Sequence, residues 1–198
     1  MGFKTGIIGL PNVGKSTLFN ALTKSKSAQA ANFPFCTIDP NIGEVTVPDK
    51  RLLELSKISV SNETIPTKMT FIDIAGLVKG ASKGEGLGNK FLANIRECDA
   101  LAHVTRCFED ENITHVNNAI DPVADIDIIN TELLLADLES VMKQIETFKK
   151  RGGKKNDEVL SLAFLEKVLE LLESGIPVRQ GNFFDDELKM LHLSQFLT

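Results

Sequence analysis

Residues 9–16 read Gly-Leu-Pro-Asn-Val-Gly-Lys-Ser and match the spacing G-x-x-x-x-G-K-[ST], which constrains the fold more than any other stretch of the chain. The glycines let the backbone curl until successive N–H groups point inward, and the positive end of a following helix adds to that cradle. In this pattern Lys15 reaches the β- and γ-phosphates of a nucleotide, and the Ser16 hydroxyl ligates Mg²⁺. Thr17 is placed to support the α-phosphate. The sequence therefore predicts a phosphate-binding loop, and the alternative is a glycine-rich turn without a ligand.

Strand and helix patterns alternate on both sides of this loop. Short apolar strands are predicted at residues 3–10, 43–47, 68–74 and 100–107, with helices at 15–24 and 89–97. This alternation is typical of a mainly parallel sheet that carries helices on both faces. We therefore predict an α/β nucleotide-binding core over residues 1–124.

The pattern changes near Pro122. Residues 125–150 read as one long helix, and a second helix ends at Gly175 with Pro177 just beyond. The apolar residues of both helices alternate in steps of three and four, which is typical of a coiled-coil seam. They are Leu134, Leu138, Val141, Ile145 and Phe148 in the first helix, and Leu162, Leu165, Leu169 and Leu172 in the second. We predict an antiparallel helical hairpin and a last short helix at 185–197, all within residues 125–198; the alternative is that both long helices pack on the sheet.

Composition narrows the class of protein. The chain has 198 residues, of which 42% are hydrophobic, and its 22 Lys and Arg against 27 Asp and Glu give a net charge of −5. No apolar run approaches the roughly 20 residues of a membrane span. Cys36, Cys98 and Cys107 form no C-x-x-C pair, which fits reduced thiols and argues against a disulfide scaffold or a zinc site. We expect a cytoplasmic, monomeric protein that overall charge does not hold to nucleic acid or to a membrane.

A second motif, Phe-Ile-Asp-Ile-Ala-Gly, occupies residues 71–76. An aspartate at the end of a strand, here Asp73, can hold Mg²⁺ through water, and the Gly76 N–H can meet the γ-phosphate. Thr37 lies between the two motifs and would complete the Mg²⁺ shell; the alternative is an ordinary surface threonine. Five glycines within residues 76–88 favour a loop that becomes ordered in one nucleotide state only.

Together the motifs resemble a translation-factor-class P-loop GTPase of the Obg-related group, and most closely the YchF family, also called Obg-like ATPases. The residues that carry this resemblance read G-L-P-N-V-G-K-S-T, N-F-P-F-C-T-I-D-P, D-I-A-G-L-V-K-G-A-S-K-G-E-G-L-G-N and R-C-F-E-D-E-N-I-T-H-V. The resemblance implies a Ras-like core with a coiled-coil insertion, ATP bound in preference to GTP, slow hydrolysis with Mg²⁺, and association with ribosomes. By motif match, nucleotide contacts fall on Asn12, Val13, Gly14, Lys15, Ser16 and Thr17, and Mg²⁺ on Ser16 and Thr37.

Two positions bear on hydrolysis. Ras-like enzymes carry a water-orienting Gln directly after the D-x-x-G glycine, and here that place is Leu77, which has no hydrogen-bonding group. The resemblance points to His115 as the catalytic substitute, and the alternative is a surface or core histidine. His103, inside an apolar strand, reads as a core histidine with its hydrogen bonds satisfied. In related hydrolases an asparagine at the place of Asn12 helps to hold K⁺, so K⁺ is a candidate second cofactor.

A basic cluster marks the predicted tip of the hairpin. It consists of Lys149, Lys150, Arg151, Lys154 and Lys155. On an acidic protein such a cluster is a candidate RNA contact. The alternative is a solvated turn whose cations favour a helix C-terminus.

Three functions remain open at this point. The first is an ATP hydrolase that acts as a nucleotide-dependent switch on ribosomes, and the second is a nucleotide-gated binding module with negligible hydrolysis, which Leu77 makes a real alternative. A GTP-specific switch is the third, and a P-loop kinase is disfavoured because the chain shows switch loops. The base-reading motif N-K-x-D and its altered form N-x-x-E are both absent, so the choice of ATP rests on the resemblance. The motif order predicts the N-terminal part of a longer protein, with the core incomplete at its C-terminus.

Overall fold

The computed structural model describes residues 2–24, 40–74, 87–110, 112–115, 120–150 and 162–198. Several residues singled out above lie outside this part of the chain: Cys36, Thr37, Gly76, Leu77, Arg151, Lys154 and Lys155. Among the helices described, none has the length and apolar character needed to cross a membrane.

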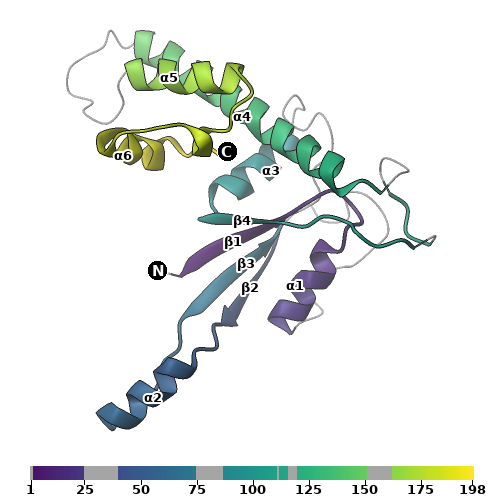
Figure 1. The fold of residues 1–198 in the computed structure, drawn as a ribbon, viewed down its shortest axis with the longest axis vertical. Helices are drawn as coiled ribbons and strands as arrows, with labels where there is room; N and C mark the ends of the chain where they lie inside the picture. Colours follow the sequence, from purple (N-terminus) through teal and green to yellow (C-terminus); the bar gives the residue numbers. More distant parts are fainter. Residues whose placement is uncertain (1, 25–39, 75–86, 111, 116–119, 151–161) are drawn as a thin grey trace. The chain divides into compact units, whose positions relative to one another are not determined.

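Four strands form one sheet in the order β2-β3-β1-β4 (Figure 1). They are β1 (Phe3–Ile8), β2 (Asn41–Thr46), β3 (Lys68–Asp73) and β4 (Ala100–His103). The central strand β1 is parallel to both β3 and β4, whereas β2 at the edge is antiparallel to β3. The predicted mainly parallel sheet is confirmed, and its antiparallel edge strand is the exception.

Helix α1 (Lys15–Thr23) packs on this sheet through one aromatic side chain. Phe19 and Ile7 of β1 are both fully buried and form a small core with the partly buried Leu22, Phe71 and Val104. The helix ends at Lys24, whose backbone is left-handed with φ 51°. Because α1 follows directly on the loop after β1, this packing fixes the loop at the end of the central strand.

Two predicted strands are shorter than expected. The first ends at Ile8 rather than residue 10 because Gly9 adopts φ 153°, where a Cβ would stand 2.3 Å from the carbonyl oxygen of Val104. The last ends at His103 rather than residue 107. His103 itself corrects the sequence interpretation: its Nε2 is buried and has no hydrogen-bond partner in the described residues, and burial lowers its pKa.

The other elements in the described part of the chain are helical. They are α2 (Lys50–Ser59), α3 (Leu87–Arg96), α4 (Pro122–Lys150), α5 (Leu162–Glu173), the short 3₁₀ helix η2 (Val178–Gln180) and α6 (Asp185–Ser194). Helix α2 was not predicted from the sequence, and none of its side chains is buried. Helix α4 begins three residues earlier than predicted because Asp121 accepts hydrogen bonds from the backbone N–H groups of Val123 and Ala124, both at 3.1 Å. Helix α6 ends at Ser194 rather than 197, since Gln195 turns left-handed with φ 52°.

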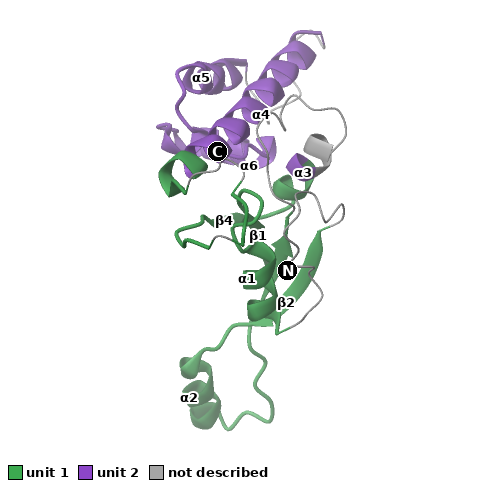
Figure 2. Cartoon of the chain, turned by 90° about the vertical axis from the view of Figure 1, so that its right-hand side faces the viewer, with its two compact units in different colours: residues 1–78, 93–125 green, residues 79–92, 126–198 purple. Residues whose placement is uncertain are grey.

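The chain divides into two compact units, residues 1–78 with 93–125, and residues 79–92 with 126–198 (Figure 2). In the second unit α5 lies beside α4, and the core between them contains Val141, Ile145, Phe164, Leu165, Val168, Leu172 and Val178. Most predicted seam residues belong to this core or pack against it. The predicted two-helix seam is nevertheless too narrow, because Phe164 and Val168 are also buried, and Met190 and Leu191 of α6 pack on the same core. The proposed domain boundary between residues 124 and 125 stays a prediction.

Within this unit Asp137 of α4 holds the segment that follows α6. Its fully buried carboxylate accepts hydrogen bonds from the backbone N–H of Leu197 (2.8 and 2.9 Å) and of Thr198 (2.9 Å), and from the Thr198 hydroxyl (2.8 Å). We expect Asp137→Ala to lower the free energy of unfolding by about 2–4 kcal/mol, because these donors lose a charged acceptor. Urea unfolding measures this loss in free energy. Circular dichroism is used to follow the unfolding, because the chain has no Trp or Tyr to serve as a fluorescent probe.

Asp137→Asn is the matched variant for this prediction. It keeps one acceptor oxygen and the side-chain volume, so we expect it to lose less stability than the alanine variant. An unfolding curve of Asp137→Ala that overlaps that of the unaltered chain would show that the carboxylate is not what holds the segment.

Candidate functional site

The loop between β1 and α1 has the backbone of an anion cradle. Asn12 and Gly14 adopt left-handed conformations with φ 62° and 102°. A Cβ at Gly14 would meet nothing within 4 Å, so the backbone conformation, and not lack of space, favours glycine there. Asparagine is among the few other residues that tolerate this region. Alternating conformations of this kind turn successive N–H groups toward one point, where an anion can accept from them.

The first turn of α1 adds to this cradle. Gly14 caps the helix without a side chain, and the first turn carries no acidic residue. The backbone N–H groups of the turn therefore meet no side-chain carboxylate from within it. With the positive end of the helix dipole, they form the type of site that binds phosphate.

Lys15 stands at the start of α1 with only 7% of its surface exposed. Its Nζ donates a hydrogen bond to the carbonyl oxygen of Leu10, within the same loop, at 2.8 Å. Burial lowers the pKa of Lys15 from 10.5 to about 8, although the charge of Asp73 opposes this shift. A buried ammonium group with a neutral carbonyl as acceptor is a cation that an anionic phosphate would stabilise strongly.

Ser16 and Asp73 meet beside this lysine. The Ser16 hydroxyl donates to Asp73 Oδ2 at 2.7 Å, so the structure brings together two of the residues that the sequence assigned to Mg²⁺. Burial raises the pKa of Asp73, while the hydrogen bond from Ser16 and the charge of Lys15 favour its ionised form. Asp73 Oδ1 is buried and has no hydrogen-bond partner among the described residues.

The side-chain oxygen atoms of Ser16 and Asp73 fit Mg²⁺. A hydroxyl and a carboxylate are oxygen ligands of the kind that this ion prefers, and Mg²⁺ sites commonly use one or two protein groups, with water and substrate phosphate completing the shell. The part of the chain that the structure describes holds no cluster of three or more His, Cys, Asp or Glu side chains able to bind a metal. Ser16 and Asp73 are therefore the candidate protein ligands in that part of the chain.

The segment after β4 contacts the phosphate loop through Asn12. The side-chain Nδ2 of Asn12 donates to the carbonyl oxygen of Thr114 at 3.1 Å. The next residue, His115, places its Nε2 2.9 Å from Asp125 Oδ2, and the two side chains are only 5% and 2% exposed. The sequence left two possibilities for His115, a catalytic residue and a surface or core histidine. Its position in the structure is that of a core histidine that contacts a carboxylate. The catalytic role of His115 stays a prediction.

Arg106 is a residue that the sequence analysis did not single out. It is 1% exposed, and its guanidinium donates to the carbonyl oxygens of Phe108 (3.1 Å), Asp110 (3.0 Å) and Ile113 (2.8 Å). It also lies 4.8 Å from the centre of the Phe108 ring. This arginine fixes the path of the backbone that leads to Thr114. In the sequence it appears only as the first residue of the segment R-C-F-E-D-E-N-I-T-H-V.

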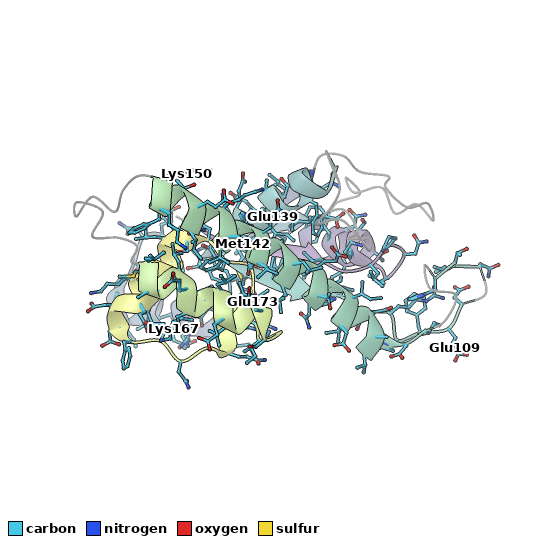
Figure 3. The ribbon with its side chains drawn as sticks, turned by 90° about the horizontal axis from the view of Figure 1, so that it is seen from above. Glu109, Glu139, Met142, Lys150, Lys167 and Glu173 are labelled. Carbon is cyan, nitrogen blue, oxygen red and sulfur yellow. The ribbon has the colours of Figure 1, made fainter. Side chains whose placement is uncertain are left out.

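The other predicted contact residues differ in how exposed they are. Val13 is 4% exposed, so its backbone N–H is the group left to meet a nucleotide, and Thr17 is exposed on α1. Lys149 and Lys150 are exposed in the last turn of α4, and Figure 3 labels Lys150 there. Lys150 Nζ lies 3.3 Å from Glu146 Oε2. The two lysines are the members of the basic cluster that the structure describes.

Comparison with known proteins gives consistent matches. A sequence model of the family described as 50S ribosome-binding GTPase matches residues 4–137. Two curated relatives, both called ribosome-binding ATPase YchF, are similar over the whole chain, at 57% identity in Pasteurella multocida and 52% in Bacillus subtilis. The chain spans about half of their length, 54% in each case. The solved structure of the Schizosaccharomyces pombe YchF GTPase is 42% identical with a TM-score of 0.73, over 99% of this chain and 54% of that one.

Proposed function

We propose that this chain, which belongs to the 50S ribosome-binding GTPase family and within it to the YchF family, binds ATP with Mg²⁺ and hydrolyses the γ-phosphate. The observation that carries this proposal is the 2.7 Å hydrogen bond between Ser16 and Asp73 beside the buried Lys15. It joins the phosphate loop to the strand-end carboxylate, as phosphoryl transfer with Mg²⁺ requires. The preference for ATP over GTP rests on the names of the relatives.

Each residue has a distinct part in the proposed reaction. The loop N–H groups and Lys15 bind and neutralise the β- and γ-phosphates, which holds the terminal phosphate in line for attack by water. Ser16 and Asp73 would hold Mg²⁺, which when bound supplies positive charge at the phosphate oxygens. Thr37 and Gly76 are proposed at the γ-phosphate end of the site.

Nucleotide titration tests the proposal. ATP and GTP are titrated separately into the chain with Mg²⁺ and with EDTA, and release of inorganic phosphate is followed over single turnovers. Bound nucleotide is easy to quantify at 260 nm because the protein lacks Trp and Tyr. We expect binding that Mg²⁺ strengthens and slow phosphate release; the same affinity with and without Mg²⁺ would contradict the metal site.

A nucleotide-gated binding module with negligible hydrolysis is the second candidate. The observation that favours it is Leu77, which occupies the place of the water-orienting Gln. Single-turnover hydrolysis with and without ribosomes separates the two functions. Marked stimulation by ribosomes supports a switch timed by hydrolysis, whereas bound ATP that persists in both conditions supports the binding module.

His115 is proposed as the group that orients the attacking water, on the strength of the family resemblance. Its hydrogen bond to Asp125 favours a different role, a structural one, because a buried pair of this type also contributes to stability. His115→Ala should slow phosphate release in the folded fraction while leaving ATP affinity near its original value, and it should also lower the unfolding midpoint, because the buried Asp125 carboxylate loses the imidazole. A large loss of stability with an unchanged rate in the folded fraction would assign the histidine to the core.

K⁺ is proposed as a second cofactor, with Asn12 as its protein ligand. The Asn12 nitrogen donates to Thr114, so the amide oxygen is the atom that would ligate the ion. We expect hydrolysis to be faster in K⁺ than in Na⁺ at equal ionic strength, and Asn12→Ala to remove that difference. Equal rates in the two salts would exclude the proposed role of K⁺.

The ribosome is the proposed partner, in the cytoplasm and with the chain acting as a monomer. The relatives are named for ribosome binding, and the cluster of Lys149, Lys150, Arg151, Lys154 and Lys155 is the proposed RNA contact. Reversal of these charges should weaken co-sedimentation with ribosomes, and the difference from the unaltered chain should shrink as the salt concentration rises, because salt screens these charges. Unchanged co-sedimentation would leave the cluster as a solvated turn.

A further inference from the structure

Strand β2 places a side-chain amide beside the candidate metal site. In the antiparallel pairing of β2 with β3, Asn41 lies directly opposite Asp73. Directly opposite residues project from the same face of a sheet, with their Cβ atoms about 5 Å apart. The amide of Asn41 therefore stands next to the carboxylate that Ser16 contacts from the other side. No motif used above includes Asn41 in the nucleotide site.

Two buried polar atoms of this pair have no hydrogen-bond partner in the described residues. They are Nδ2 of Asn41, which can only donate, and Oδ1 of Asp73, which accepts when the carboxylate is ionised. Buried polar groups without partners are uncommon, because each raises the free energy of the folded chain. A donor and an acceptor of this kind on facing residues therefore indicate a hydrogen bond that forms when the site is complete.

We propose that Asn41 is a positioning residue for Mg²⁺, donating from Nδ2 to Asp73 Oδ1 and fixing the carboxylate toward the metal. This inference rests on the proposed Mg²⁺–ATP function. Ser16 holds Oδ2, and the amide of Asn41 holds Oδ1, so the carboxylate cannot rotate. Each carboxylate oxygen has two lone pairs, which leaves capacity for metal-bound water.

The chemistry of an amide suits this position. Asn41 is neutral, so it orients Asp73 without adding a positive charge that would compete with Mg²⁺ for the carboxylate. A lysine there would neutralise Asp73 instead. Groups that hydrogen-bond to metal-ligating carboxylates fix the orientation of those ligands, and their loss costs metal sites about 10- to 100-fold in affinity.

The test uses two variants, Asn41→Ala and Asn41→Leu, with Thr46→Ala as the control at the exposed far end of the same strand. The chain is loaded with fluorescent mant-ATP, and the rate of nucleotide release is measured as a function of free Mg²⁺. We expect the Mg²⁺ concentration for half-maximal retention to rise about 10- to 100-fold in both Asn41 variants and to stay unchanged in Thr46→Ala. Affinity for mant-ATP in EDTA should be the same in all four proteins.

Each other outcome overturns a definite statement. Unchanged Mg²⁺ dependence in both Asn41 variants overturns the positioning role. A defect in Asn41→Ala that Asn41→Leu restores also overturns it, because leucine fills the space without a donor and would identify a packing effect. Weakened binding in EDTA would place the effect in the fold rather than at the metal. If the unaltered chain shows no Mg²⁺-dependent retention, the proposed function fails, whatever the variants do.

Discussion

Replacement of Lys15 with methionine is expected to weaken ATP binding and hydrolysis about 100- to 1,000-fold, the usual cost of deleting an electrostatic group from a phosphate or oxyanion site. The same change should make the nucleotide-free chain more resistant to unfolding. Lys15 is 7% exposed, and burial lowers its pKa to about 8, so the folded state holds this charge at a cost. Methionine has a similar length and no charge, and it removes that cost together with the function.

The control for this prediction is Lys24→Met. Lys24 lies just beyond the other end of α1 and is exposed, so it tests loss of a lysine without loss of a buried charge. We expect this variant to bind ATP and to unfold as the unaltered chain does. Retention of ATP affinity in Lys15→Met would contradict the assignment of Lys15 to the phosphates.

The depressed pKa of Lys15 also predicts how stability and binding depend on pH. Between about pH 8, the pKa in the folded chain, and 10.5, the ordinary value, the unfolded chain binds more protons at this residue than the folded one. The contribution of Lys15 to stability therefore rises with pH across this window and is constant below it. ATP affinity changes in the opposite direction above about pH 8, because phosphate binding needs the charged ammonium. Both trends should be absent from Lys15→Met.

Sequence spacing was sufficient to predict the part of the site that one short segment forms. Gly14, Lys15 and Ser16 are adjacent in the chain, and their motif has a single backbone solution between a strand and a helix. Asp73 was predictable because it ends an apolar strand, and carboxyl ends of neighbouring parallel strands meet at one edge of a sheet.

Other residues depend on contacts that leave no sequence pattern. Asn41 faces Asp73 only because β2 pairs antiparallel in one particular register, which the period of the side chains does not specify. Arg106 binds backbone carbonyls, and every residue supplies one, so its partners have no recognisable residue type. The α5 core was underestimated for a similar reason, because the a/d spacing describes two helices and α6 adds a third.

Arg106→Ala is expected to lower the free energy of unfolding by about 3–4 kcal/mol. The substitution removes a guanidinium that is 1% exposed and takes a charged donor from three carbonyl oxygens, those of Phe108, Asp110 and Ile113. Arg106→Lys should recover little of this, because a single ammonium cannot reproduce the fork of donors. Urea unfolding monitored by circular dichroism gives the measurement.

Arg51→Ala is the matched control, because Arg51 also pairs through its guanidinium, to Asp49, but on the surface of α2. We expect its unfolding curve to overlap that of the unaltered chain, since exposed ion pairs contribute little. The effect of Arg106 should also extend to the nucleotide site, because the segment that it holds ends at Thr114, whose carbonyl oxygen accepts from Asn12. Conditions that keep Arg106→Ala folded should therefore reveal faster ATP release. A variant that loses stability but releases ATP at the original rate would confine Arg106 to the fold and separate Thr114 from nucleotide binding.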